Sequence, residues 1–433
     1  MKLVLNDLLL HLHPTTVPLR ALKVTYTFGL GGLSILLLGV LAITGALLLF
    51  AYTPTPDQAH KSIETLQTEI WLGQFVRNLH HWSANLLLIL VVLHMLRVFY
   101  TAAFHHPREF NWVLGLALLL LVAGANFSGY LLPWDQLSYW AVTIVTSMLD
   151  YIPLAGPAIR RAVLGGPEVG ASTLRNFFAF HISVLPFSIF VIVAFHIWRV
   201  RKDTISIPRA VDEDPPTKRQ LKYVTTVPHL VVLEVTGGLI VLALLLLWSG
   251  TVNAPLLESA DPHHPPNPAK AAWYFVGFQE LLLHFHPVYA SFVIPALTLL
   301  ALVLLPYLDF DPDRDPNVTG IWFRSARGRR LAGLGLLVGT VWTTLMVVID
   351  EYWLDLPSLL SFLPNSISTG LIPLLATLLG LFIFRLALRA HGATASESNM
   401  ALFSLLFAAF VTLTAIGLFF RGQNMALMWP WEV

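Results

Sequence analysis

The sequence has 433 residues, of which 56% are hydrophobic and only 12% are charged, well below the ~25% typical of soluble domains. A soluble enzyme of this size could not bury so much apolar surface, so the composition excludes that class. The net charge of +1 provides no positive field for nucleic acid, and the absence of cysteine excludes disulfides, thiolate metal sites and thioether-linked cofactors.

Nine apolar runs are long enough to cross a bilayer, which takes about 20 helical residues. In chain order they cover 29–52, 79–100, 110–132, 177–199, 229–249, 288–308, 331–350, 368–389 and 400–420. The sequence therefore predicts an all-α polytopic membrane protein. Residues 1–25 are polar and contain Pro14 and Pro18, so we expect no cleavable signal peptide.

A charged stretch with several prolines, Arg199 to Lys222, follows the fourth run. We expect it to separate an N-terminal four-helix domain at 1–210 from a second domain at 211–310 and from further membrane helices with a tail at 311–433. Lys and Arg are concentrated in alternate connecting segments, and the positive-inside rule then places these segments and the N-terminus in the cytoplasm.

Two apolar runs each carry two histidines. His80 and His94 are 14 residues apart, and His181 and His196 are 15 apart. On a helix these spacings correspond to about 21 and 22 Å of rise, and each brings the two side chains to roughly the same face. Both runs cross from outside to inside, so His80 lies level with His181 (the first pair), and His94 with His196 (the second pair).

Facing imidazoles at two depths suit two low-spin haems, each ligated by one pair, with the first pair nearer the outer side. Without cysteine these haems are b-type and non-covalent. The alternative is four unrelated core histidines.

Four glycines and two arginines follow the same two levels. Glycine lets a flat macrocycle approach the backbone, although close helix packing has a similar pattern. The arginines flank the histidines of 79–100 and are placed to bind haem propionates, or to anchor the helix at the membrane interface. These residues are Gly32, Gly45, Gly115, Gly129, Arg77 and Arg97.

Two motifs resemble cytochrome b of the cytochrome bc complexes. They are Arg77-Asn-Leu-His80-His-Trp-Ser with His94-Met-Leu-Arg97, and Gly129-Tyr-Leu-Leu-Pro133-Trp134-Asp135-Gln136. The resemblance is closest over 24–210 and extends over 225–310. The spacing of 15 residues between His181 and His196 and the Trp-Asp-Gln motif are similar to the photosynthetic branch of the family. The parts that resemble cytochrome b and subunit IV of that branch are fused in this one chain.

The resemblance implies that 1–210 is a dihaem cytochrome b domain and that 211–310 is subunit IV-like with a quinol-site loop. Quinol would be oxidised near Trp140, Trp273 and Tyr274 on the outer side. One electron would pass to an iron–sulfur partner and the other through both haems to an inner quinone, with proton translocation. The expected partners are a Rieske-type protein, a cytochrome c-type subunit and a second copy of the chain, in the plasma membrane of a prokaryote.

The quinol site departs from the family pattern, because Ala271-Ala272-Trp273-Tyr274 stands where Pro-Glu-Trp-Tyr is usual. The missing Glu is thought to accept a quinol proton. Glu280 is either its displaced replacement or an interface carboxylate, and His284 and His286 are other acceptors. The altered motif favours menaquinol.

Two residues on the inner side, Arg201 and Glu234, are candidates for a second quinone site. Two other functions stay open. One is a dihaem anchor that exchanges electrons between quinone and a peripheral dehydrogenase without bifurcation. The other is a channel or transporter whose histidines relay protons or bind metal.

Overall fold

The computed structural model describes residues 13–211, 213, 216, 218–308 and 318–432. Within them, nine helical segments are long and apolar enough to cross a membrane. They are Leu30–Leu48, Gly73–Tyr100, Glu109–Leu131, Ala171–Asp203, Thr226–Thr251, Tyr289–Tyr307, Ala326–Tyr352, Ile367–Ala390 and Ala395–Phe419. The expected class, an all-α multi-pass membrane protein, is confirmed.

The chain forms two compact units, each made of several chain segments. Unit 1 comprises Met1–Leu132, Phe177–Leu256 and Asn317–Arg324, and unit 2 comprises Pro133–Asn176, Leu257–Pro316 and Ser325–Val433. The units are groups of residues in contact, and the domains expected from the sequence remain a prediction. The boundary expected between 310 and 311 lies outside the described residues.

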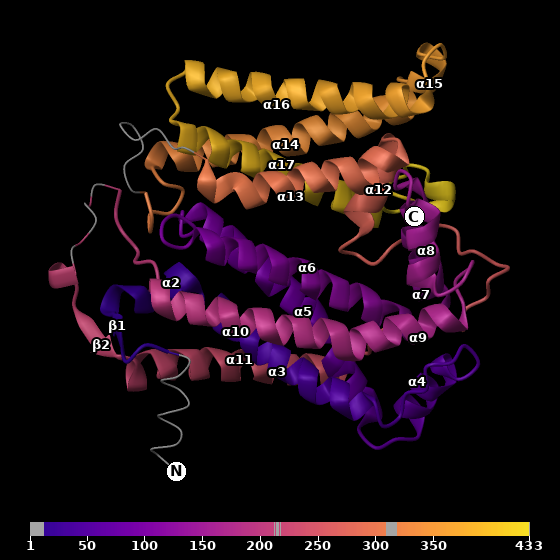
Figure 1. Cartoon of the computed structure of the whole chain (residues 1–433), viewed down its shortest axis with the longest axis horizontal. Helices are drawn as coiled ribbons and strands as arrows, with labels where there is room; N and C mark the ends of the chain where they lie inside the picture. Colours follow the sequence, from indigo (N-terminus) through magenta and orange to yellow (C-terminus); the bar gives the residue numbers. More distant parts are fainter. Residues whose placement is uncertain (1–12, 212, 214–215, 217, 309–317, 433) are drawn as a thin grey trace. The chain divides into compact units, whose positions relative to one another are not determined.

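Unit 1 is built on five long helices (Figure 1): α3 (Leu30–Leu48), α5 (Gly73–Tyr100), α6 (Glu109–Leu131), α10 (Leu185–Asp203) and α11 (Val231–Thr251). Helix α5 packs against α3, α6 and α11, whereas α10 packs against α6. The two histidine-bearing helices, α5 and α10, therefore share α6 as a neighbour instead of packing closely against each other. Short strands β1 (Thr16–Pro18) and β2 (Tyr223–Thr225) pair antiparallel and join the segments that precede α3 and α11.

The fourth span contains a π turn, Phe180–Val184, between α9 (Ala171–Ala179) and α10. Pro186 is the second residue after it, and a proline inside a helix has no N–H and collides with the carbonyl four residues earlier. A widened turn is one way for a helix to continue past such a residue. The π turns Tyr289–Val293 and Ile367–Leu371 likewise precede Pro295 and Pro373.

Unit 2 holds the remaining spans together with shorter helices (Figure 1): α7 (Gln136–Ser147), α8 (Gly156–Leu164), α12 (Val276–His284), α13 (Ile294–Leu304), α14 (Ala326–Tyr352), α16 (Ile372–Ala390) and α17 (Ala395–Phe419). Helix α17 packs against α12, α14 and α16. Asp135 caps α7, since its carboxylate accepts the Ser138 N–H at 2.9 Å, and Thr394 and Glu397 form a similar capping box on α17.

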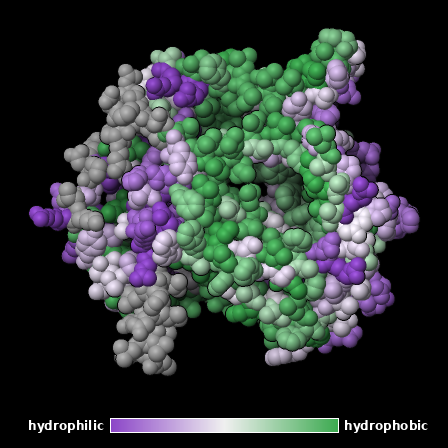
Figure 2. Space-filling view, viewed as in Figure 1, coloured by the Kyte–Doolittle hydropathy of each residue, from purple (hydrophilic) through white to green (hydrophobic). Residues whose placement is uncertain are grey.

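The faces that the helices do not bury against one another are apolar. Ile43, Leu244, Leu337 and Phe382 are each more than half exposed. Figure 2 shows hydrophobic side chains over the long helices and hydrophilic side chains gathered near helix ends. Large apolar surfaces of this kind are incompatible with water but suit lipid.

Two glycines of α14 allow it to pack closely against α17. A Cβ placed on Gly335 would lie 2.2 Å from the Ala401 carbonyl oxygen, and one on Gly339 would lie 2.3 Å from that of Leu405. Small residues four apart on one helix allow a neighbouring helix to approach this closely.

We expect Gly339→Leu to force these helices apart and to destabilise the protein by about 1–3 kcal/mol or more, as overpacking does. Gly333→Leu is the matched control, because a Cβ at Gly333 meets open space on the same helix. The midpoint of thermal unfolding, measured in detergent, compares the two. Equal midpoints would contradict the inferred contact.

Candidate functional site

The first histidine pair lies in unit 1. His80 projects from α5 and His181 from the π turn ahead of α10, and their ring centroids are 6.3 Å apart with an interplanar angle of 74°. The two residues expected to lie level as a facing pair therefore do face each other. The π turn matters here, because such turns re-aim side chains and are frequent at functional sites.

The second pair repeats this geometry further along the same helices. His94 of α5 and His196 of α10 have ring centroids 6.5 Å apart and an interplanar angle of 75°. Both pairs thus bridge the space between two helices that each pack on α6.

The ring separations fit a shared metal. A metal–imidazole bond of about 2 Å on each side, with each ring centre about 1 Å behind its nitrogen, places the centroids of two axial ligands about 6 Å apart. Both observed distances match this value. The residues present therefore fit a group with one metal between two imidazoles, as in a bis-histidine haem.

In the first pair, the Nδ1 atom of each imidazole has hydrogen-bond partners. The Thr44 hydroxyl lies 2.9 Å from Nδ1 of His80, and Nδ1 of His181 lies 3.1 Å from the Ala125 carbonyl and 3.2 Å from the Ser128 hydroxyl. Partners on one ring nitrogen orient the imidazole and leave the other nitrogen for a metal. Sequence reasoning missed Thr44 and Ser128, although each directly precedes one of the glycines that it singled out.

Three of the expected glycines face the histidine rings. A Cβ would lie 3.2 Å from His80 Cε1 at Gly45, 2.6 Å from His181 Cε1 at Gly129, and 3.6 Å from His196 Cε1 at Gly115. Each keeps a side chain out of the space beside an imidazole.

The fourth expected glycine requires a correction. Gly31, not Gly32, faces His94, with its Cβ position 3.6 Å from Cε1, whereas that of Gly32 lies 3.8 Å from the Glu234 carboxylate. Gly31 and Gly45 are 14 residues apart, the same spacing as Gly115 and Gly129. Equal spacing on the two helices was the pattern that would have identified Gly31.

The two arginines have different surroundings. Arg77 is buried and donates to the carbonyls of Ala254 at 2.9 Å and Pro255 at 2.6 Å, so it fastens the segment after α11 to α5. Arg97 donates from Nε to the Tyr26 carbonyl and stacks on the Tyr26 ring, while its buried Nη2 finds no acceptor among the described residues. An unpaired buried guanidinium nitrogen fits an anionic group such as a propionate.

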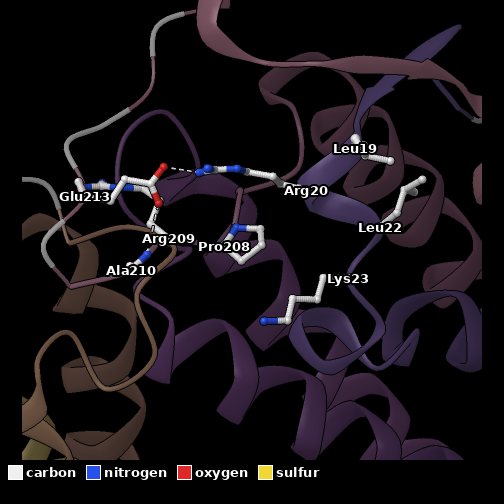
Figure 3. Close-up of a pocket in the computed structure, with 8 residues that line it drawn as sticks. All are labelled: Leu19, Arg20, Leu22, Lys23, Pro208, Arg209, Ala210 and Glu213. Atoms are coloured by element: carbon white, nitrogen blue, oxygen red, sulfur yellow. Dashed lines mark hydrogen bonds and ion pairs between the residues drawn. The ribbon is translucent and has the colours of Figure 1, made fainter.

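The expected inner-side residues also lie in unit 1. Glu234 in the first turn of α11 pairs with His13 at 3.2 Å, and Arg201 is exposed in the last turn of α10. A cavity of about 570 Å³ lies elsewhere in this unit (Figure 3), where Arg20 and Glu213 form an ion pair. Its lining residues are Leu19, Arg20, Leu22, Lys23, Pro208, Arg209, Ala210 and Glu213, which include neither expected residue.

The expected quinol-site residues all lie in unit 2. Trp140 on α7 donates its indole N–H to the Asp261 carbonyl at 3.3 Å, and Trp273 and Tyr274 pack edge to face just before α12. The side chain of Gln279 fixes the backbone of the preceding segment, because it accepts a hydrogen bond from the Ala271 N–H and donates one to the Ala269 carbonyl.

Glu280 is fully buried on α12 and is bound by Arg421, whose Nη2 lies 2.6 Å and Nε 3.1 Å from its carboxylate. Burial raises the pKa of Glu280, but hydrogen bonds from His284 and Arg421 outweigh it and hold the pKa below its ordinary value. The anion, which is the form able to accept a proton, is therefore the stabilised form of Glu280, and its role as a displaced proton acceptor stays a prediction.

His284 is the group in this cluster that holds a proton. Its Nε2 lies 3.2 Å from Glu280 and its Nδ1 2.7 Å from Asp350 on α14. Burial lowers the pKa of His284, but the hydrogen bonds with Asp350 and Glu280 outweigh this and raise the pKa to about 9. His284 is therefore protonated at neutral pH.

Facing imidazole pairs within a bundle of apolar helices define the class: an all-α membrane protein with the ligand geometry of a haem-binding electron carrier. Residues 17–204 match the family described as Cytochrome b/b6/petB. The chain is 42% identical over 196 residues to cytochrome b6 of Heliobacterium modesticaldum, which is 45% of this chain and 90% of that protein. The chain belongs to the cytochrome b/b6 family, which implies b-type haem.

Two further comparisons extend this result. The menaquinol:cytochrome c reductase cytochrome b subunit of Geobacillus thermodenitrificans is 38% identical over 184 residues, 42% of this chain and 82% of that protein. A chain of a solved hyperthermophilic respiratory Complex III is 24% identical with a TM-score of 0.65, and the likeness covers 94% of both chains. The shared fold therefore includes the C-terminal helices.

Proposed function

We propose that this chain is the cytochrome b subunit of a quinol:cytochrome c-type oxidoreductase and binds two non-covalent b haems. One haem would be ligated by His80 and His181 and the other by His94 and His196. The observation that carries this proposal is the separation of 6.3 and 6.5 Å between the paired rings, which suits bis-imidazole ligation. When bound, the haems would carry single electrons between the two sides of the membrane.

The chain's own residues prepare these sites. Thr44, Ser128 and the Ala125 carbonyl hold the Nδ1 atoms of the first pair, which presents Nε2 to the metal. Gly45 and Gly129 keep side chains away from the rings, and Arg97 offers a buried cation to a propionate. Arg77 shares the same helix, although its contacts to Ala254 and Pro255 already use two of its nitrogens.

Quinol would be oxidised at the outer side, at a site in unit 2 near Trp140, Trp273 and Tyr274. Glu280, with its partners His284 and Arg421, would belong to this site. Glu234 and Arg201 would serve a second quinone site at the inner side. Menaquinol is supported by the missing motif Glu at Ala272 and by the similarity to a menaquinol:cytochrome c reductase subunit of Geobacillus thermodenitrificans. Release of protons outside and uptake inside would couple the reaction to proton translocation.

The domain division proposed here is a dihaem domain at 1–210, a subunit IV-like domain at 211–310 and additional helices at 311–433. The chain has no cysteine for a c-type haem or a cluster, so a Rieske-type protein and a cytochrome c-type subunit would complete a complex that contains two copies of the chain. The distribution of Lys and Arg supports a cytoplasmic N-terminus, and the bacterial sources of the similar proteins support a prokaryotic plasma membrane.

An absorption spectrum of the purified complex, oxidised and then reduced, tests this proposal. We expect two b-type haems per chain with two midpoint potentials, and oxidant-induced haem reduction in the presence of quinol. A colourless, folded protein would overturn the haem assignment. Two haems without oxidant-induced reduction would favour the dihaem anchor instead, a function that Ala272 in place of the motif Glu also favours.

We expect Gly129→Ala to remove haem from the first pair in most chains, because the added Cβ meets His181 at 2.6 Å and the ring must move. Gly124→Ala is the matched control on the same helix, since its Cβ would make an ordinary 3.8 Å contact with Leu185. Potentiometric titration of the haem bands measures each site. If Gly129→Ala keeps both haems with unchanged midpoint potentials, this packing is contradicted.

A further inference from the structure

A chain of three titratable side chains runs from the buried interior of unit 2 toward its surface. Glu280 is 0% exposed, His284 10% and Asp350 33%. Glu280 Oε1 lies 3.2 Å from His284 Nε2, and His284 Nδ1 lies 2.7 Å from Asp350 Oδ2. Each ring nitrogen of one imidazole is thus bonded to a different carboxylate.

We propose that Glu280, His284 and Asp350 form a proton relay that carries protons released by quinol oxidation to the outer surface. This proposal rests on the proposed function and deepens it. An imidazole can take a proton at one nitrogen while it releases another from the opposite nitrogen. Glu280 would first take a proton on the quinol side. His284, protonated at both ring nitrogens, would give its Nδ1 proton to Asp350 and keep the proton at Nε2. The ring would then turn over, so that the free nitrogen faces Glu280 and takes the next proton; protons balance and no oxidant is needed.

The entrance of the relay, Glu280, lies on α12, the helix that follows the Trp273–Tyr274 segment. Glu280 follows Tyr274 by six residues, about 9 Å along a helix axis. The Ala272 carbonyl accepts the N–H groups of Phe275 and Val276, so the Trp273–Tyr274 segment leads directly into α12. A proton released by quinol at this segment would enter the relay at the buried Glu280 carboxylate.

The exit of the relay lies on a cavity of about 690 Å³. His284, Asp350 and Asp355 are among its lining residues, together with His286 and Glu351. A partly exposed carboxylate on a polar cavity can pass a proton to water. The cavity therefore supplies the solvent that the buried end of the relay lacks.

Charged groups from three elements surround His284. Glu280 comes from α12, Asp350 from α14, and Arg421, which follows α17, approaches Nε2 at 3.5 Å. Arg421 also binds Glu351 at 2.9 Å, so one guanidinium bridges two carboxylates. Arg421 acts as a positioning residue that keeps Glu280 anionic and aimed at the imidazole.

The test uses the purified complex, a short-tailed menaquinol analogue, and haem reduction as the readout. We expect His284→Gln and Asp350→Asn each to slow quinol oxidation by at least about tenfold with haem content unchanged. The residual rate should rise more steeply with pH than in wild type, because water must then accept the proton. His284→Ala should be partly restored by added imidazole, which a purely structural role would not allow.

Asp150→Asn is the matched control, since this carboxylate of unit 2 pairs with Arg160 outside the relay. Wild-type rates and pH profiles in both relay variants would overturn the relay and leave the proposed function intact. A wild-type complex that binds haem but does not oxidise the quinol analogue would overturn the proposed function and the relay with it. If His284→Gln fails to fold, Asp350→Asn still decides.

Discussion

Replacing His80 by alanine is expected to lower the haem content from two to about one per chain and to abolish quinol oxidation. The ring of His80 faces His181 at 6.3 Å, and its removal takes away one of two axial ligands. The second pair shares no ligand with the first, so its haem should stay. Haem per chain and the number of midpoint potentials measure the outcome.

His81→Ala is the control for this variant. His81 is the next residue on α5, but its ring packs on Trp82 and not on another histidine. It should therefore keep both haems. His94→Ala should give the complementary loss, with only the other midpoint potential remaining. Two haems retained in both His80→Ala and His94→Ala would refute the ligand assignment.

Replacing Arg421 by methionine is expected to destabilise the protein by about 3–5 kcal/mol, the usual cost of removing one partner of a buried ion pair. Arg421 is 1% exposed and donates to Glu280, Glu351 and the Met425 carbonyl. Without it, Glu280 is left as a charge with no exposure and with His284 as its neighbour.

A double-mutant cycle with Glu280→Gln separates this cause from lost packing. If the unpaired carboxylate causes the instability, Arg421→Met with Glu280→Gln should recover most of the lost stability, as judged by the thermal midpoint in detergent. Additive losses in the double variant would show that Arg421 stabilises mainly through its other contacts.

The spans were predictable because hydrophobicity is a local property of the chain. Each of the nine apolar runs corresponds to a helix in the structure, and most ends agree to within a few residues. The π turns at Phe180–Val184, Tyr289–Val293 and Ile367–Leu371 were not expected, although Pro186, Pro295 and Pro373 follow them. The short β1–β2 pairing was also missed, because it joins residues about 200 positions apart through backbone atoms that carry no sequence pattern.

The histidine pairs were predictable for a related reason. Helical rise and rotation follow from spacing alone, so two histidines on each of two parallel spans must fall at two depths. Gly31 was missed because one residue changes direction on a helix by about 100°. Thr44 and Ser128 were missed because a hydroxyl in a membrane helix more often bonds to its own backbone.

By itself, the sequence determined the membrane class, the spans, the four histidines and the family, since each depends on composition, periodicity or a contiguous motif. Only the tertiary structure decided that Glu280 is bound by Arg421 and that His284 is shared with Asp350. These partners are 141 and 66 residues apart along the chain. No local pattern links them, because the packing of α12 against α17 brings one pair together and a contact with the end of α14 completes the other.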